Sequence, residues 1–251
     1  MWLRSFVLSV ILPWTLFAQA DSSMFRHSLF TKVLKSHVED GLVDYEAIKA
    51  DAVFDQYLRV LATTDPAALD TKKEQLAFWI NAYNAYTIKL IIDRMPLESI
   101  RDISLGLPIL FGPWSIDIAD IGGTSYTLNE IEHDIIRDQF GDPRIHFALV
   151  CAALSCPKLR EEAYEGLALN SQLDEDARRF LNDTSRNQFD LEGRTMYLSK
   201  IFDWYESDFE ESAGSVSAFI AHYVSQGARS LTENENADIE YLPYDWGLNT
   251  K

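Results

Sequence analysis

The chain has 251 residues, of which 47% are hydrophobic and 24% are charged, with only 11 Gly and 8 Pro. These proportions are ordinary for a globular protein and exclude the collagen-like, low-complexity and intrinsically disordered classes. The formal net charge of −17, from 22 Lys and Arg against 39 Asp and Glu, disfavours nucleic acid and anionic membrane surfaces as partners, because both are bound through clustered cations.

Residues 1–20 have the pattern of a secretory signal peptide. Arg4 supplies a short basic segment, Phe6–Phe17 follows as an apolar core, and Ala18-Gln19-Ala20 resembles a cleavage site. Removal of this segment would leave residues 21–251, which is enough for one large domain. We therefore expect an exported protein that resides in the periplasm or outside the cell.

The first elements after the signal are predicted to be helical. Ser23–Val38 places apolar residues at helical spacing, and Asp40-Gly41 ends the pattern. A short extended piece at Leu42–Tyr45 leads into a second helical stretch that ends near Leu61, and Asp65-Pro66 begins another.

The longest predicted helix is Lys72–Arg94, which ends before Pro96. It is apolar almost all round, so we expect it to be buried at the centre of the fold. Asn81 and Asn84 lie three residues apart on this helix, and an amide buried there needs hydrogen-bond partners. These polar residues also make the stretch unsuitable for crossing a bilayer, so no membrane span is expected after signal removal.

The middle of the chain carries the strand signals. Ser115–Asp120 and Thr124–Tyr126 flank a Gly-Gly pair and predict a hairpin, and Phe189–Leu191 and Thr195–Leu198 predict a second one. The continuous apolar run Arg144–Ala153 is predicted to be a buried strand.

Further helices complete the predicted fold. Thr127 and Glu130 form a capping box that opens a helix to about Phe140. Other helices are expected after Asn170, over Lys200–Glu206 with Ser199 as N-cap, and over Val216–Ser225. The chain ends in the aromatic segment Ile239–Asn249, in which Asp245 and Trp246 are expected to belong to a segment that docks on the core. The elements together predict an α+β fold, a single helix-rich domain whose buried central helix packs on a small, mainly antiparallel sheet.

Several motifs, well separated along the chain, occur in the order found in one known family. They are Val43-Asp44-Tyr45, Ala77–Thr87, Glu132-His133, Arg144–Pro157, Leu198–Phe202 and Tyr244–Asn249. Over about residues 44–249 the chain resembles the domain-of-unknown-function family numbered 547, whose bacterial members often carry an export signal. The resemblance implies no established activity. It also implies that Cys151 is the steadier cysteine, because some relatives have Ser at the position of Cys156.

The two cysteines, Cys151 and Cys156, lie five residues apart and leave several roles open. A disulfide requires a sharp turn between them, because the two Cα atoms must come within about 7 Å. Cys151 could instead be an inert buried thiol or a nucleophile with a base close by. A zinc site with His133 and His146 does not match the usual ligand spacing, so we predict no metal. Glycine-rich phosphate loops are absent from the sequence, so we predict no cofactor.

The leading catalytic hypothesis makes Cys151 the nucleophile and His133 the base. Glu132, or an amide from Asn81 or Asn84, is the group that orients the base. His146 is a weaker partner, because five residues along one predicted strand would place it on the face opposite Cys151. Further candidates for binding or orienting a substrate are Asn81, Asn84, Trp79 and Tyr83. For these four, the alternative is a purely structural role, with amides that bond loop backbone and rings that pack in the core.

Three functions follow from these residues. The first is a cysteine-dependent hydrolase or acyltransferase with papain-like or transglutaminase-like chemistry, although papain-like folds carry their nucleophile at the start of the central helix, which here contains Asn81 and no cysteine. The alternative is a non-catalytic binding module for a small molecule or peptide, in which both cysteines are paired. The third is an interaction scaffold whose acidic surface recruits a basic partner.

Overall fold

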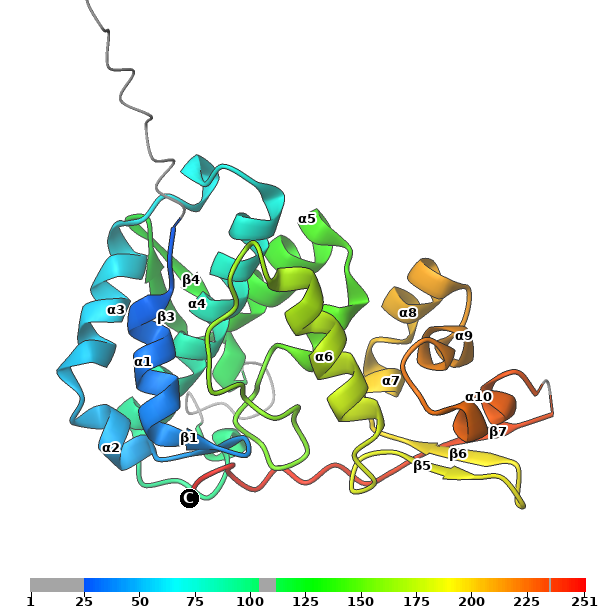
Figure 1. Ribbon diagram of the computed structural model, residues 1–251. Helices are drawn as coiled ribbons and strands as arrows, with labels where there is room; N and C mark the ends of the chain where they lie inside the picture. The colour runs from blue at the N-terminus through cyan, green and yellow to red at the C-terminus, as the bar shows by residue number, and fades with distance from the viewer. Residues whose placement is uncertain (1–24, 104–111, 235) are drawn as a thin grey trace, which may run out of the picture.

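The structure, a computed structural model, describes residues 25–103, 112–234 and 236–251 (Figure 1). The predicted signal peptide, residues 1–20, lies outside the described residues. Within the described part of the chain many helices accompany three small sheets, which confirms the predicted α+β class. None of the described helices is both long enough and apolar enough to span a membrane.

The N-terminal helices form one side of the molecule. The helices α1 (Ser28–His37), α2 (Tyr45–Lys49) and α3 (Ala52–Thr63) lie together in Figure 1. Between α1 and α2 the chain forms a very short antiparallel hairpin of β1 (Val38–Glu39) and β2 (Leu42–Val43), where the sequence predicted only an extended piece. Two short 3₁₀ turns, η1 (Pro66–Ala68) and η2 (Ile100–Asp102), lie on either side of the next helix.

The central helix α4 (Lys72–Arg94) has the bounds that the sequence predicted. It begins at a capping box in which Thr71 and Glu74 satisfy each other's backbone amides. From Leu76 to Ile88 every side chain is buried, because α2, β3 (Asp117–Ile121) and the helix around residue 133 all pack against it. The polar residues of α4 must therefore be satisfied inside the protein.

The predicted hairpin after η3 (Pro113–Ser115) is confirmed as β3 (Asp117–Ile121) and β4 (Thr124–Thr127). Its turn requires glycine at Gly122, where φ is +57° and a Cβ atom would lie 3.0 Å from the carbonyl oxygen of Thr64. The turn thus lies directly against the end of α3.

The helix that follows β4 contains an unusual central section. Thr127 and Glu130 form the predicted capping box, with the Glu130 amide donating to Thr127 Oγ1 at 3.1 Å and the Thr127 amide donating to Glu130 Oε2 at 2.7 Å. The section η4 (Glu130–Arg137) is a π-helix, and it continues as α5 (Asp138–Phe140). Such wide turns are rare and occur often at functional sites.

The predicted strand over Arg144–Ala153 is wrong. Pro143 instead begins the 3₁₀ helix η5 (Pro143–Phe147), whose first turn is capped by the Asp142 carboxylate at 3.1 Å from the Arg144 amide. The residues that follow are irregular but buried. The apolar run therefore predicted the burial of this segment correctly. Such a run does not by itself distinguish a strand from other buried conformations.

The C-terminal third adds further helices and a three-stranded sheet. The helices are α6 (Leu169–Leu181), α7 (Ile201–Trp204), α8 (Glu206–Ala213), α9 (Val216–Ala221) and α10 (Gln226–Thr232), and the strands are β5 (Gln188–Asp190), β6 (Thr195–Leu198) and β7 (Asp238–Tyr241). The antiparallel pair β5–β6 is the second predicted hairpin, whereas β7 pairs parallel to β6 and was not predicted.

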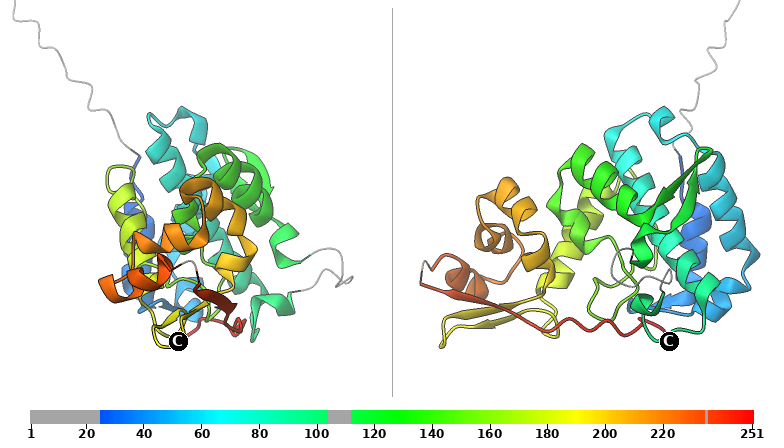
Figure 2. Two further views of the ribbon diagram at one scale, coloured as in Figure 1. Left: turned by 90° about the vertical axis from the view of Figure 1, so that its right-hand side faces the viewer. Right: turned by 180° about the vertical axis from the view of Figure 1, so that it is seen from behind.

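The buried apolar residues form two clusters, one around α4 and one between α6 and the C-terminal helices. Phe147 packs in the second cluster although its neighbours Ile145 and Ala148 belong to the first, and Tyr244 packs against both. After β7 the chain runs from the end that holds α10 back to the N-terminal hairpin, as Figures 1 and 2 show. The last residues therefore cross the junction between the clusters.

Candidate functional site

A pocket of about 230 Å³ lies where the two clusters meet. Its walls come from α4, from the short helices η3, η4 and η5, and from α7. The loop from Cys151 to Cys156 (the cysteine loop) and the residues after β7 (the C-terminal segment) complete them. The lining residues are Tyr83, Trp114, Asn129, Glu132, His133, His146, Leu149, Cys151, Cys156, Pro157, Ile201, Trp204, Tyr205, Tyr244 and Trp246.

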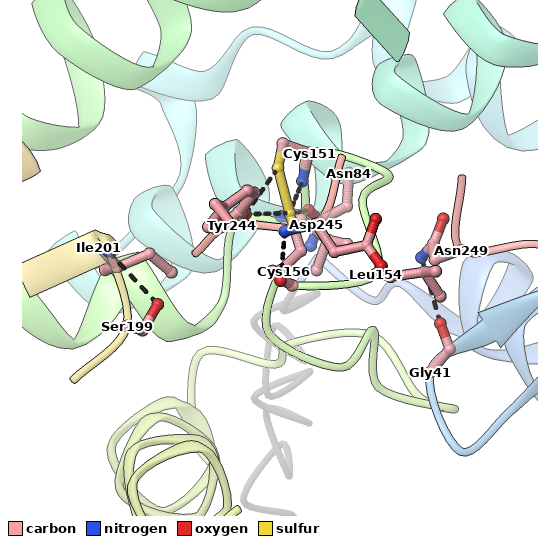
Figure 3. Close-up of a disulfide and its surroundings, with 12 residues drawn as sticks. Gly41, Asn84, Cys151, Leu154, Cys156, Ser199, Ile201, Tyr244, Asp245 and Asn249 are labelled. Carbon is pink, nitrogen blue, oxygen red and sulfur yellow. Dashed lines mark hydrogen bonds between the residues drawn. A yellow bond between two sulfur atoms is a disulfide. The ribbon is translucent and has the colours of Figure 1, made fainter. Parts of the chain in front are cut away.

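Cys151 and Cys156 are joined by a disulfide at the wall of this pocket (Figure 3). Their Cα atoms are 6.2 Å apart, because the chain turns sharply at Ala152, whose φ is +62°. Tyr244 lies beside the bridge: its hydroxyl donates to Cys156 Sγ at 3.2 Å and lies 3.4 Å from Cys151 Sγ. In this oxidised form the protein has no thiol nucleophile.

The C-terminal segment holds the cysteine loop in place through its backbone. The amide of Leu154 donates to the Gly247 carbonyl at 2.8 Å, and the amide of Ser155 donates to the Asp245 carbonyl at 3.1 Å. Trp246 also packs against the first hydrophobic cluster, which confirms the prediction that Asp245 and Trp246 belong to a segment that docks on the core.

His146 is the buried histidine of the site. Its Nε2 lies 2.8 Å from Asp208 Oδ2, and its ring stacks on Tyr205 with 3.8 Å between the ring centroids. Burial lowers the pKa of His146, although the nearby Asp208 carboxylate acts in the opposite direction. The ring is therefore neutral at pH 7, with Nε2–H donating to Asp208 and Nδ1 left with a lone pair.

Asp208 is in turn held by Arg137. The guanidinium donates from Nε at 2.8 Å and from Nη2 at 2.6 Å to the two carboxylate oxygens. Although partial burial opposes ionisation, the hydrogen bonds from Arg137 and His146 hold the pKa of Asp208 far below its usual range. The three side chains form one connected network behind the pocket.

Glu132 and His133 occupy neighbouring positions on η4 but have different surroundings. Glu132 is buried, and its Oε1 accepts the Tyr205 hydroxyl at 2.5 Å. His133 is exposed, and Arg137 Nη1 lies 2.9 Å from its Nδ1. Because a guanidinium can only donate, His133 Nδ1 is the acceptor in this contact.

Several aromatic rings of the lining pack against one another. Tyr244 lies 4.6 Å from Trp246 and 4.8 Å from Trp204, measured between ring centroids, and Trp114 lies 5.8 Å from Trp246. Trp204 is 45% exposed. Such a cluster presents large, rigid apolar faces in the lining of the pocket.

The structure brings together most of the residues that the sequence singled out. The predicted site residues that line the pocket are Tyr83, Glu132, His133, His146, Cys151 and Cys156. The sequence argument against His146 depended on the strand that is not formed, so that argument fails. The structure gives His146, and not His133, a carboxylate partner.

Asn81, Asn84 and Trp79 do not line the pocket. Asn84 donates to the Ala148 carbonyl and accepts from the Val150 amide, both at 2.9 Å. Asn81 exchanges the same two bonds with the backbone of Tyr164 at 2.8 and 2.9 Å. Trp79 packs edge-on against Phe78 and Tyr126 in the core. The two asparagines thus bond the backbone of buried loops, as a neighbouring strand would do.

Sequence reasoning missed the contributions of Trp114, Trp204, Tyr205 and Asp208. Tyr205 and Asp208 follow closely on the motif Leu198–Phe202, which the family resemblance had already marked. A polar or aromatic residue just after such a motif is the only local signal that could have indicated them. Among the described residues, no group of three or more His, Cys, Asp and Glu side chains is arranged to hold a metal ion.

Comparison with known proteins gives one match. Residues 66–181 match the model of a family described as "Protein of unknown function, DUF547". This segment contains α4, η4 and both cysteines, and it supports the resemblance seen in the sequence. No curated protein and no solved structure matches the chain. Five of the pocket-lining residues lie outside the matched segment: Ile201, Trp204, Tyr205, Tyr244 and Trp246.

Proposed function

We propose that the protein is a binding module whose pocket holds a small organic molecule or a side chain of a peptide. The observation that carries this proposal is a pocket walled by aromatic rings in which the only two cysteines are joined to each other. A paired sulfur cannot act as a nucleophile, whereas apolar walls with a few convergent polar groups are typical of ligand sites.

The size of the pocket limits the ligand. Its volume of about 230 Å³ lies below the range of roughly 300–1,000 Å³ that is common for drug-sized ligands. The ligand should therefore be a small molecule or one terminal group of a larger one.

Protein-observed NMR with a library of small fragments tests this proposal. We expect bound fragments to shift the indole resonances of Trp204 and Trp246, and we expect Trp246→Ala to weaken their binding. The indole resonance of Trp79, which packs in the core outside the pocket, is the internal control and should not shift. Fragments that bind elsewhere, or none that bind at all, would overturn the proposal.

A second function is favoured by one specific observation: the neutral His146, oriented by Asp208, lines the same pocket as Cys151. If the disulfide were reduced, Cys151 could act as nucleophile, with His146 as base and Asp208 as the orienting carboxylate. The reaction would be acyl transfer or hydrolysis of an amide or thioester.

Alkylation with iodoacetamide and a mass readout separates the two functions. The binding proposal expects no adduct on the native protein without reductant. A single fast adduct at Cys151 in the native protein, slowed in His146→Gln but not in the exposed control His222→Gln, would instead favour the enzyme.

We also propose that the protein is exported. The signal-like pattern of residues 1–20 supports this proposal. The disulfide supports it as well, because disulfides form and persist in oxidising compartments. N-terminal sequencing of the protein from an exported fraction should find Asp21 as the first residue. An intact N-terminus on protein that remains in the cytosol would contradict it.

A further inference from the structure

We infer that the pocket selects a quaternary ammonium group, a cation without N–H bonds; this rests on the proposed binding function and names the chemistry of the ligand. Three properties of the site lead to it: the charge that remains in its walls, the aromatic rings that line the same pocket, and the presence of only one carboxylate among the lining residues.

The charges in and behind the pocket leave one negative charge unpaired. Asp208 is neutralised by the two hydrogen bonds from Arg137, the buried ring of His146 is neutral, and His133 Nδ1 accepts from Arg137. Glu132 is buried, and it takes part in no ion pair among the described residues. The Glu132 carboxylate is therefore the charge that a ligand would complement.

Aromatic rings line the same pocket as this carboxylate. Tyr205 donates to Glu132, and the rings of Tyr244, Trp204 and Trp246 belong to the same lining. The negative face of an aromatic ring attracts cations, most strongly for tryptophan, and cages of such rings bind quaternary ammonium groups.

Two of the rings already attract cations of the protein itself. The guanidinium of Arg101 lies 5.2 Å from the ring centroid of Trp246, and that of Arg137 lies 5.2 Å from that of Tyr205. Neither arginine is among the residues that line the pocket.

The lining offers a single carboxylate to a cation that carries N–H bonds, and its other side-chain acceptors are uncharged: Asn129, the histidine rings and the tyrosine hydroxyls. A primary ammonium has three donors that need partners when they leave water. Glu132 is the only carboxylate among the lining residues, and it already accepts the Tyr205 hydroxyl. A quaternary ammonium has no N–H bond, so its transfer from water into the pocket leaves no donor without an acceptor.

Titration of the protein's tryptophan fluorescence with choline tests the inference, with its neutral isostere 3,3-dimethylbutan-1-ol as the paired probe. Sodium chloride at equal ionic strength serves as the salt control. We expect choline to bind roughly tenfold or more tightly than the isostere, because the two differ only in the charge that faces Glu132 and the rings.

Two variants of η4 locate the charge that matters. Glu132→Gln keeps an acceptor for the Tyr205 hydroxyl but removes the charge, and it should abolish most of the preference for choline. Asp134→Asn removes one charge from an exposed position two residues away on the same helix, and it should leave the preference unchanged. Equal loss in both variants would mean that only the overall charge acts, which would overturn the inference.

The outcomes separate the inference from the function on which it rests. If choline and the isostere bind equally, charge selection is wrong while the binding module stands. If neither probe binds, the inference is wrong, and the fragment experiment decides the binding function independently. N-acetyl-trimethyllysine methylamide distinguishes the source of the group, since tighter binding than choline indicates a peptide side chain and weaker binding a free small molecule.

Discussion

His27 is a buried histidine whose protonation the fold opposes. It lies just before α1, with Nδ1 2.6 Å from the Tyr57 hydroxyl, and burial lowers its pKa to about 3. An unfolded histidine titrates near pH 6.5. The folded state therefore binds fewer protons below that pH, so the stability conferred by His27 is complete above about pH 6.5 and falls as the pH decreases toward 3.

We expect the free energy of unfolding to fall between pH 7 and pH 5, and His27→Gln to lose about 2 kcal/mol less over that interval than the unsubstituted protein. The dependence should not vanish, because burial also lowers the pKa of His146. Urea unfolding at each pH measures the effect. The exposed His222 gives the control variant His222→Gln, and a slope for His27→Gln equal to that of this control would refute the assignment.

Asn84 supplies the buried segment after η5 with hydrogen bonds that a neighbouring strand would otherwise make. Its side chain bonds the Ala148 carbonyl and the Val150 amide, so Asn84→Ala would leave two buried backbone groups without partners. We expect a loss of roughly 2–5 kcal/mol in the free energy of unfolding. The exposed Asn170→Ala on α6 should change it by less than about 0.5 kcal/mol. Similar values for the two variants would show that the Asn84 bonds are dispensable.

The cysteine loop is held by both a covalent bond and hydrogen bonds. The disulfide closes a loop over a sequence separation of 5, for which chain entropy predicts a stabilisation of roughly 2 kcal/mol. The double variant Cys151→Ser/Cys156→Ser should lose about this much and still fold, because the backbone bonds from Gly247 and Asp245 remain. Urea unfolding with and without dithiothreitol measures it. Dithiothreitol should destabilise only the unsubstituted protein, and a further effect on the double variant would contradict the prediction.

The elements that the sequence predicted well are those with local signals. α4 has a buried apolar pattern with a Pro beyond its end, and both hairpins have turn residues between short strands. β7 was missed because its parallel pairing with β6 joins segments some forty residues apart, and nothing near Asp238–Tyr241 announces it. The segment after Pro143 was misassigned because its side-chain partner, Asn84, is distant in sequence.

The candidate site was predictable only in part, for the same reason. Glu132, His146 and the cysteines belong to short motifs, so chemistry alone marked them. Which histidine meets a carboxylate depends on how α8 packs against η5, and Asp208 carries no local pattern that would reveal its contact with His146. Residue type therefore identified candidates, whereas their pairing required the fold.

The two hydrophobic clusters share residues in a way that should make them unfold together. Phe147 stands in the chain between residues of the first cluster, but its side chain packs against Phe180, Phe202 and Phe209 in the second. Tyr244 contacts both clusters, and the C-terminal segment that carries it ends beside β2, where the Val43 amide donates to the Asn249 carbonyl at 2.9 Å. Loss of either cluster would expose apolar surface of the other.

We therefore expect one cooperative transition in urea, with the same midpoint by tryptophan fluorescence and by far-ultraviolet circular dichroism. Phe30→Ala in the first cluster and Phe219→Ala in the second should each cost about 3–5 kcal/mol and shift that single transition as a whole. Two separated midpoints, or a variant that moves one signal and leaves the other in place, would show two independent domains. A single transition also predicts that a fragment limited to residues 66–181 does not fold alone, because it lacks Phe202, Phe209 and Tyr244.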